Sequence, residues 1–269
     1  MIHVLPRHLA PCHIVVIGIL LIVGLPVAAL AEDAVVTPVA AGMQPAPHAV
    51  PAPKAVVELF TSQGCSSCPP ADKLLGDLAK RPDVVALTLA VDYWDYLGWK
   101  DTLAKHGHSL RQKAYAKVRG DGKMFTPQVV LNGSVMAVGN DEDALDGALA
   151  SAAVPRVPVA IATTDGKLAV KVGTGTMAGA GHGEVWLCPL ASDVTVKIGR
   201  GENEGSTMTY HNVVRGWTRL GEWNGGEVRF ETGLDEIRAD SIDSVAILVQ
   251  SGTQASPGTI LGAALAPLP

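Results

Sequence analysis

The segment VELFTSQGCSSCPPADKLL, at residues 57–75, contains the pattern that decides the predicted fold. Its first part belongs to an apolar strand at residues 55–60, and its second part has the apolar spacing of a helix over residues 66–80. Cys65 and Cys68 lie between the two. The segment therefore predicts a strand and a helix that are joined by a loop carrying a C-x-x-C pair.

Elements of both kinds follow along the chain. We expect a strand at residues 84–91 that is covered on both faces, a polar surface helix at 101–118, strands at 128–131 and 134–138, and a helix that ends near residue 150. Asn132-Gly133, between the two short strands, favours a hairpin turn because both residues tolerate positive φ. Asp141 is a suitable N-cap for the last helix. The order β-α-β-α-β-β-α predicts an α/β domain over residues 54–153.

The cysteine pair is a candidate thiol-disulfide site. A cysteine that precedes a helix lies at its amino end, where the helix dipole and free N–H groups stabilise a thiolate and lower its pKa. Cys65 is therefore the candidate nucleophile, and Cys68 is placed to resolve a mixed disulfide. Pro69 and Pro70 lack N–H groups and fit the start of a helix.

Two other interpretations of the pair are open. The cysteines can form a structural disulfide, or they can supply part of a metal site. A zinc site normally takes four nitrogen or sulfur ligands. Beyond residue 31 the sequence holds one further cysteine, Cys188, in an apolar run where a buried free thiol is expected. For a redox pair we expect no metal and no other cofactor.

A second segment, FTPQVVLNG at residues 125–133, is similar to a segment of glutaredoxins. In those proteins the proline is cis, and the backbone of the preceding residue docks the substrate. The resemblance implies that Pro127 is a cis-proline facing the cysteine pair and that Thr126 is the docking residue. Glutaredoxins continue with a Gly-Gly and an aspartate that hold glutathione. Residues 138–141 read VGND and lack one of these glycines, which counts against glutathione.

Residues 57–75 and 126–133, together with GRGENEG at 199–205 and YHNVVRG at 210–216, resemble a bacterial family of secreted thioredoxin-like proteins. That family is known as a domain of unknown function. The resemblance implies a thioredoxin-like fold and a dithiol site, and it implies no particular substrate.

Other side chains are weaker candidates for the same site. Glu58, in the first strand, is a candidate proton acceptor for Cys68, as a strand acid is in thioredoxins; a solvated residue at a sheet edge is the alternative. The loop at residues 92–100 is rich in aromatic residues. Trp94 and Tyr96 are therefore candidates for substrate binding, although such residues also cap a core.

The second half of the chain has a different pattern. Short runs of alternating apolar and polar residues separated by Gly-rich turns predict strands over most of residues 157–269. Several strands at such spacing favour a sandwich. The expected fold class is thus an α/β thioredoxin-like fold at residues 54–153, followed by a mostly β, sandwich-like domain at residues 154–269.

The first part of the chain resembles an export signal. A basic start with Arg7 and no acid precedes an apolar run at residues 14–30, and residues 29–31 read A-x-A, so that residues 1–31 predict a signal peptide. An uncleaved anchor is the alternative, since about 17 apolar residues can just span a bilayer. Residues 32–53 contain five prolines and predict an extended linker. We expect a periplasmic or secreted protein, in a compartment where disulfides persist.

Composition narrows the range of partners. The chain has 21 basic and 26 acidic residues, and this acidic balance argues against nucleic acid. The membrane is a partner only if the signal peptide stays uncleaved. The sequence predicts a protein that exchanges disulfides with a protein thiol or disulfide. The alternative is an extracytoplasmic binding module whose cysteines form a structural disulfide or a copper site.

Overall fold

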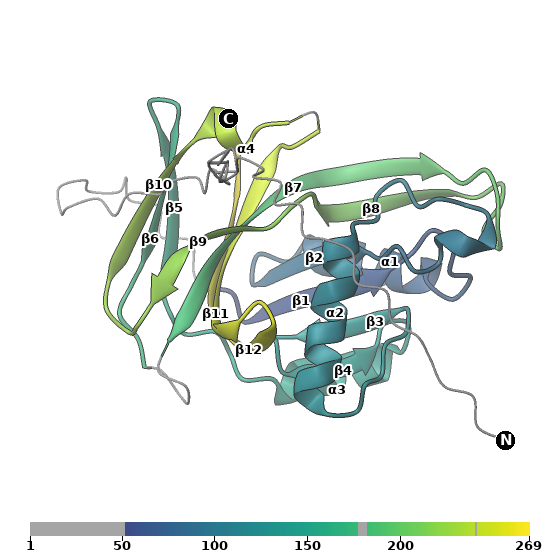
Figure 1. The fold of residues 1–269 in the computed structure, drawn as a ribbon, viewed down its shortest axis with the longest axis horizontal. Helices are drawn as coiled ribbons and strands as arrows, with labels where there is room; N and C mark the ends of the chain where they lie inside the picture. Colours follow the sequence, from purple (N-terminus) through teal and green to yellow (C-terminus); the bar gives the residue numbers. More distant parts are fainter. Residues whose placement is uncertain (1–51, 177–181, 240) are drawn as a thin grey trace, which may run out of the picture. The chain divides into compact units, whose positions relative to one another are not determined.

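The computed structural model describes residues 52–176, 182–239 and 241–269 (Figure 1). The predicted signal peptide and almost all of the predicted linker lie outside these residues. Among the helices of the described residues, none combines the length and the apolar character that crossing a bilayer requires.

The helices are α1 (Pro69–Ala79), α2 (His106–Arg119), α3 (Glu142–Ser151) and α4 (Leu234–Ile237), with a 3-10 helix η1 (Asp95–Leu97). The strands are β1 (Ala55–Thr61), β2 (Val84–Ala90), β3 (Gln128–Leu131), β4 (Val135–Val138), β5 (Val159–Thr164), β6 (Lys167–Val172), β7 (Gly183–Lys197), β8 (Thr207–Val214), β9 (Thr218–Trp223), β10 (Val228–Gly233), β11 (Ser244–Thr253) and β12 (Ser256–Pro267).

A single mixed sheet connects the two halves of the chain. Its strand order is β12-β11-β7-β8-β2-β1-β3-β4, and β9 pairs with β7. In Figure 1 the green strands β7 and β8 continue into the blue strands β2 and β1. The junction lies between β2 and β8, where Thr88 donates from Oγ1 to the carbonyl of His211 and Asn212 donates from Nδ2 to the carbonyl of Ala86. A small second sheet has the order β10-β6-β5.

The expected fold class, an α/β thioredoxin-like fold followed by a separate mostly β domain, is wrong. The described chain is mostly β, and strands from both halves share one sheet. The reason is that β2 is buried along its whole length and needs a neighbour at its outer edge, which β8 provides. β7 is long enough to pair with β11 over its first half and with β8 over its second. Strand alternation indicates which face a residue takes and says nothing about its neighbouring strand.

The two faces of β1 pack against different helices. Val57 and Leu59 belong to a cluster with Leu75 of α1. Phe60 lies on the opposite face of the strand and makes an edge-to-face contact with Tyr115 of α2 at a centroid distance of 6.4 Å. The cysteine loop follows β1 directly and leads into α1, so that the pair belongs to the α1 face of the sheet.

The predicted hairpin turn is confirmed, and it also joins the two halves of the chain. Asn132 and Gly133 have φ values of 46° and 71°. The side-chain oxygen of Asn132 accepts a hydrogen bond from the Val56 N–H of β1 at 2.6 Å. The backbone carbonyl of Asn132 accepts one from the Ile260 N–H of β12 at 2.9 Å. A Cβ at position 133 would collide with the carbonyl oxygen of Gly258.

We expect Gly133→Ala to lower the free energy of unfolding by more than about 1 kcal/mol, since an alanine at positive φ carries roughly that cost before any collision. Gly120→Ala is the matched control, because Gly120 has a φ of 79° and open space around its Cα. Comparing the urea unfolding of both variants isolates the cost of the collision with Gly258 of β12. Equal losses in the two variants would contradict the close approach at Gly133.

Candidate functional site

The cysteine pair lies where the sequence predicts it, between β1 and α1. Cys65 and Cys68 form a disulfide with a Cα–Cα distance of 5.4 Å. Cys68 is the N-cap of α1, and Pro69 and Pro70 occupy its first two positions. Both cysteines are almost completely buried, with exposed fractions of 1% and 0%. A thiol that attacks this disulfide must therefore displace the groups that cover it.

A turn from the second half of the chain holds the cysteine loop. The Asn203 side-chain amide donates to the carbonyls of Gln63 and Cys65, both at 2.9 Å. The Glu202 carboxylate accepts from the Ser66 N–H at 3.3 Å. Both residues belong to the GRGENEG segment, for which the family resemblance was the only sequence signal. The cysteine loop is therefore seated by residues that lie far along the chain.

The Glu202 contact allows a test of the local field. We expect Glu202→Gln to lower the pKa of the Cys65 thiol in the reduced protein, because a carboxylate at the amino end of the helix disfavours a thiolate nearby. The pH dependence of Cys65 alkylation measures this pKa. Glu204→Gln is the control, since Glu204 makes no side-chain hydrogen bond to the cysteine loop among the described residues. An unchanged alkylation profile in Glu202→Gln would remove Glu202 from the site.

Two of the predicted substrate-binding residues meet beside the cysteine loop. Trp94 donates from Nε1 to the Thr126 hydroxyl at 2.8 Å. A Cβ on Gly64, the residue before Cys65, would lie 3.2 Å from the Trp94 Cβ. Tyr96, in η1, is 79% exposed and stands on the same loop as Trp94.

Pro127, which precedes β3, and residues 139–140, which follow β4, lie near the start of α1. The Thr126–Pro127 peptide bond is cis, as the glutaredoxin resemblance implies. A Cβ on Gly139 would lie 3.1 Å from Pro127 and 3.3 Å from Ala71 of α1. Asn140 donates from its side chain to the carbonyl of Ser67 at 3.3 Å. Pro127 is thus close to the helix turn that carries the pair.

Glu58 is not brought to the cysteines. Its carboxylate accepts hydrogen bonds from Arg111 Nε and from the Tyr115 hydroxyl, each at 2.6 Å. Because side chains alternate along a strand, Glu58 shares the α2 face with Phe60, whereas the pair belongs to the α1 face. The structure therefore places Glu58 in a buried ion pair with Arg111, which is 7% exposed.

A different acid, which no pattern in the sequence indicates, lies close to the pair. Asp72 is in the first turn of α1, and its N–H donates to the Cys68 carbonyl at 3.0 Å. The side chain is 3% exposed, and neither carboxyl oxygen has a hydrogen-bond partner among the described residues. Burial raises the pKa of Asp72 well above its usual value; the nearby Thr61 hydroxyl, which is itself buried without a hydrogen-bond partner among the described residues, opposes the rise, and the charge of Asp101 adds to it. Residues four apart share a helix face, so this carboxyl can hold a proton near Cys68.

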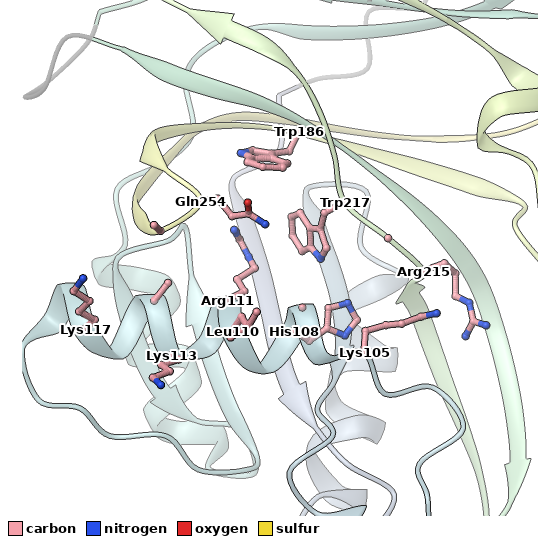
Figure 2. A pocket seen from close by; sticks show the side chains of 14 residues that line it. Lys105, His108, Leu110, Arg111, Lys113, Lys117, Trp186, Arg215, Trp217 and Gln254 are labelled. Carbon is pink, nitrogen blue, oxygen red and sulfur yellow. The ribbon is translucent and has the colours of Figure 1, made fainter. Parts of the chain in front are cut away.

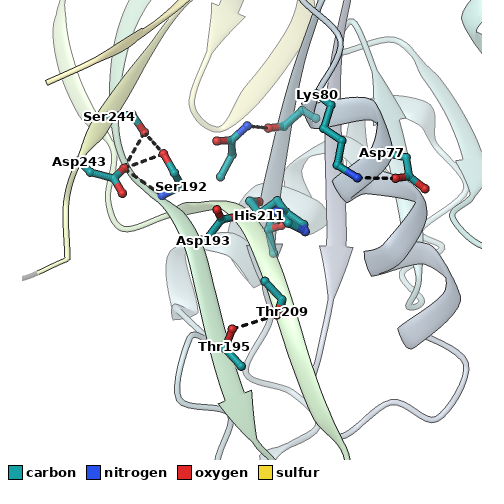
Figure 3. A network of polar contacts seen from close by, with 12 residues as sticks. Asp77, Lys80, Ser192, Asp193, Thr195, Thr209, His211, Asp243 and Ser244 are labelled. Carbon is teal, nitrogen blue, oxygen red and sulfur yellow. Dashed lines mark hydrogen bonds and ion pairs between the residues drawn. The ribbon is translucent and has the colours of Figure 1, made fainter.

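A cavity of about 400 Å³ between α1 and β8 reaches Asp72. His211 of β8 lines the cavity, and its Nδ1 lies 2.5 Å from a carboxylate oxygen of Asp193 (Figure 3). Helix α1 approaches β8 this closely because Gly76 has no side chain; a Cβ there would collide with the His211 ring. The cavity thus brings solvent close to Asp72, although both carboxyl oxygens stay buried.

The third described cysteine is separate from the pair. Cys188 is buried and free in β7, as predicted, and burial raises the pKa of its thiol. In the part of the chain that the structure describes, no group of three or more histidine, cysteine, aspartate or glutamate side chains is arranged to hold a metal ion.

The fold and the site together define a mostly β protein, built on a mixed sheet, with a buried C-x-x-C disulfide at the start of a helix. The chain belongs to the DUF1223 family, described as a protein of unknown function, whose model matches residues 56–250. It is similar to the crystal structure of protein AGR_C_4864 from Agrobacterium tumefaciens, with 32% sequence identity and a TM-score of 0.69 over 80% of this chain and 94% of that one. No curated protein matches the chain.

Proposed function

We propose that this protein exchanges disulfides with a protein partner outside the cytoplasm, with Cys65 as the attacked and attacking sulfur and Cys68 as the resolving one. The observation that carries the proposal is the buried, unpartnered carboxyl of Asp72, one turn after Cys68. Burying a carboxyl without a partner costs free energy. A structural disulfide does not require such a group. In an exchange reaction the carboxyl can give a proton to a leaving thiolate or take one from an attacking thiol. The chemistry proposed is that of thioredoxin-like proteins, on a different overall fold.

The reaction balances without any cofactor. A partner thiolate attacks Cys65 Sγ, the bond between the two cysteines breaks, and Cys68 leaves as a thiolate that takes the proton held by Asp72. A second partner thiolate then attacks the partner sulfur of the mixed disulfide, and Cys65 leaves. The partner gains a disulfide, and two electrons pass to the pair. The reverse reaction runs through the same steps, and the relative reduction potentials set its direction.

The proposed docking surface lies beside the pair. Thr126 and Trp94 are bonded to each other next to the cysteine loop, and Tyr96 on the same loop presents an exposed ring. In the proposal Pro127 and the backbone of Thr126 receive the partner chain, while Trp94 moves aside to admit its sulfur. Residues 1–31 are proposed to direct the protein to the periplasm or the exterior.

A structural disulfide in a binding module is the second candidate, and the burial of both sulfurs favours it. Equilibration in graded glutathione buffers, with thiol counting and circular dichroism, separates the two. For an exchange protein we expect reduction between about −270 and −120 mV with the fold retained. A potential below about −300 mV, with unfolding upon reduction, would establish the structural role.

A further inference from the structure

A large cavity lies on the α2 side of the sheet, away from the α1 face that carries the cysteines. Its volume is about 610 Å³, within the range of about 300–1,000 Å³ that small-molecule sites occupy. Helix α2 forms one wall, Trp186 of β7 and the β8–β9 loop form the other, and the β11–β12 turn closes one end (Figure 2).

The body of the cavity is apolar and aromatic. Trp186 and Trp217 meet edge to face, with ring centroids 6.4 Å apart. Leu110 of α2 lies opposite them and is 53% exposed, although it is a large apolar residue. An apolar ligand placed between Leu110 and the indoles would remove this surface from water.

The charges around the cavity all have one sign. Five cationic side chains line it, and no aspartate or glutamate does: Lys105, Arg111, Lys113, Lys117 and Arg215. Arg111 is neutralised by Glu58. The other four have no acidic partner within ion-pair distance among the described residues. In Figure 2 Lys105 and Arg215 extend to the same end of the cavity, so that an anionic group there would meet both.

Two residues that line the cavity each carry a buried ring nitrogen with no hydrogen-bond partner among the described residues, His108 Nε2 and Trp217 Nε1. His108 is completely buried, and its Nδ1 lies 2.9 Å from the Ala90 carbonyl, so that Nδ1 donates and Nε2 is left as an acceptor. Burial lowers the pKa of His108 to about 4, and the nearby charges of Arg111, Lys105 and Arg215 act in the same direction. Both nitrogens are closed to solvent, so that a ligand would reach them only if neighbouring groups move.

We propose that this cavity binds a small organic anion with an apolar body, such as an aromatic carboxylate or sulfonate. The body lies between Leu110 and the two indoles, and the acid group lies between Lys105 and Arg215. The site is independent of the disulfide and of its proposed chemistry.

Two dyes with the same apolar body test the role of charge. Anilinonaphthalene sulfonate carries the anion, and N-phenylnaphthylamine lacks it. We expect the protein to bind the sulfonate at least about tenfold more tightly than the neutral dye. Dye fluorescence and quenching of the tryptophan fluorescence measure both affinities. Naphthoate should compete for the same site. Equal affinity for the two dyes would overturn the proposal.

Variants then locate the binding. Arg215→Gln and Lys105→Gln should each weaken binding of the sulfonate about tenfold and leave the neutral dye within about twofold. Lys100→Gln is the matched control, an exposed lysine outside the cavity. Urea unfolding confirms that each variant is folded. Sulfonate binding that is equally strong in Arg215→Gln and in Lys100→Gln would place the dye elsewhere and refute the site. Serine at both cysteines should leave dye binding unchanged.

Discussion

Replacing Asp72 with asparagine is expected to slow reduction of the disulfide by dithiothreitol by about 100-fold at neutral pH, the usual contribution of a positioned acid. The carboxyl lies one turn from Cys68, and its raised pKa favours the protonated form, whereas an amide of the same shape has no acidic proton to give. The rate is measured by stopped-flow thiol counting. Asp77→Asn is the control, because Asp77 is an exposed residue of the same helix whose carboxylate is paired with Lys80. Equal rates in the two variants would exclude Asp72 from the exchange.

The same substitution should also change stability, with a sign that depends on pH. Burial raises the pKa of Asp72, while the carboxyl of the unfolded chain releases its proton near about pH 4. Above that pH the unfolded state gains by ionising, so the folded state loses stability as pH rises until the folded carboxyl ionises too. Asp72→Asn should therefore be more stable than the parent at neutral pH and equal to it below about pH 4. Urea unfolding at both pH values tests this; a loss of stability at neutral pH would show that Asp72 has a partner.

Replacing Glu58 with glutamine is expected to lower the free energy of unfolding by about 3–5 kcal/mol. The reason is that Arg111 is buried and would lose its counter-charge, and that the amide offers one acceptor oxygen where the carboxylate offers two, one to Arg111 and one to Tyr115. Urea unfolding measures the loss. Glu58→Leu combined with Arg111→Met is the control, because removing both charges avoids an unpaired one and should restore most of the stability. A loss below about 1 kcal/mol in the single variant would contradict the buried pair.

Local features of the fold could be predicted from the sequence because they depend on residues near one another. The loop from β1 to α1, the Asn132-Gly133 turn and the Asp141 N-cap, which accepts from the Ala144 N–H, all follow from short patterns. The pairing of β2 with β8 could not be predicted, since the alternation of a strand carries no information on its partner. The expectation of two separate domains failed at this point.

The candidate site divides in the same way. The spacing of Cys65 and Cys68 predicts the disulfide. The resemblance of residues 125–133 to a glutaredoxin segment predicts Thr126. Asp72 gave no signal, because an acid in the first turn of a helix is usually explained by the helix dipole. Asn203 gave none either, since it reaches the Cys65 carbonyl over 138 residues of sequence. Contacts of this kind are decided by the tertiary fold.

The hydrogen bonds from Asn203 to the cysteine loop cannot form until Asn203 has been synthesised. At a synthesis rate of about 5–20 residues per second, the two cysteines emerge on the order of ten seconds before Asn203 exists. During that interval neither Asn203 nor β8 is present to cover the loop or the edge of β2. The nascent thiols are then open to any oxidant, and the pair can be oxidised before it is buried. The finished protein would therefore begin in the disulfide form, and the first round of the proposed exchange would oxidise thiols of the partner.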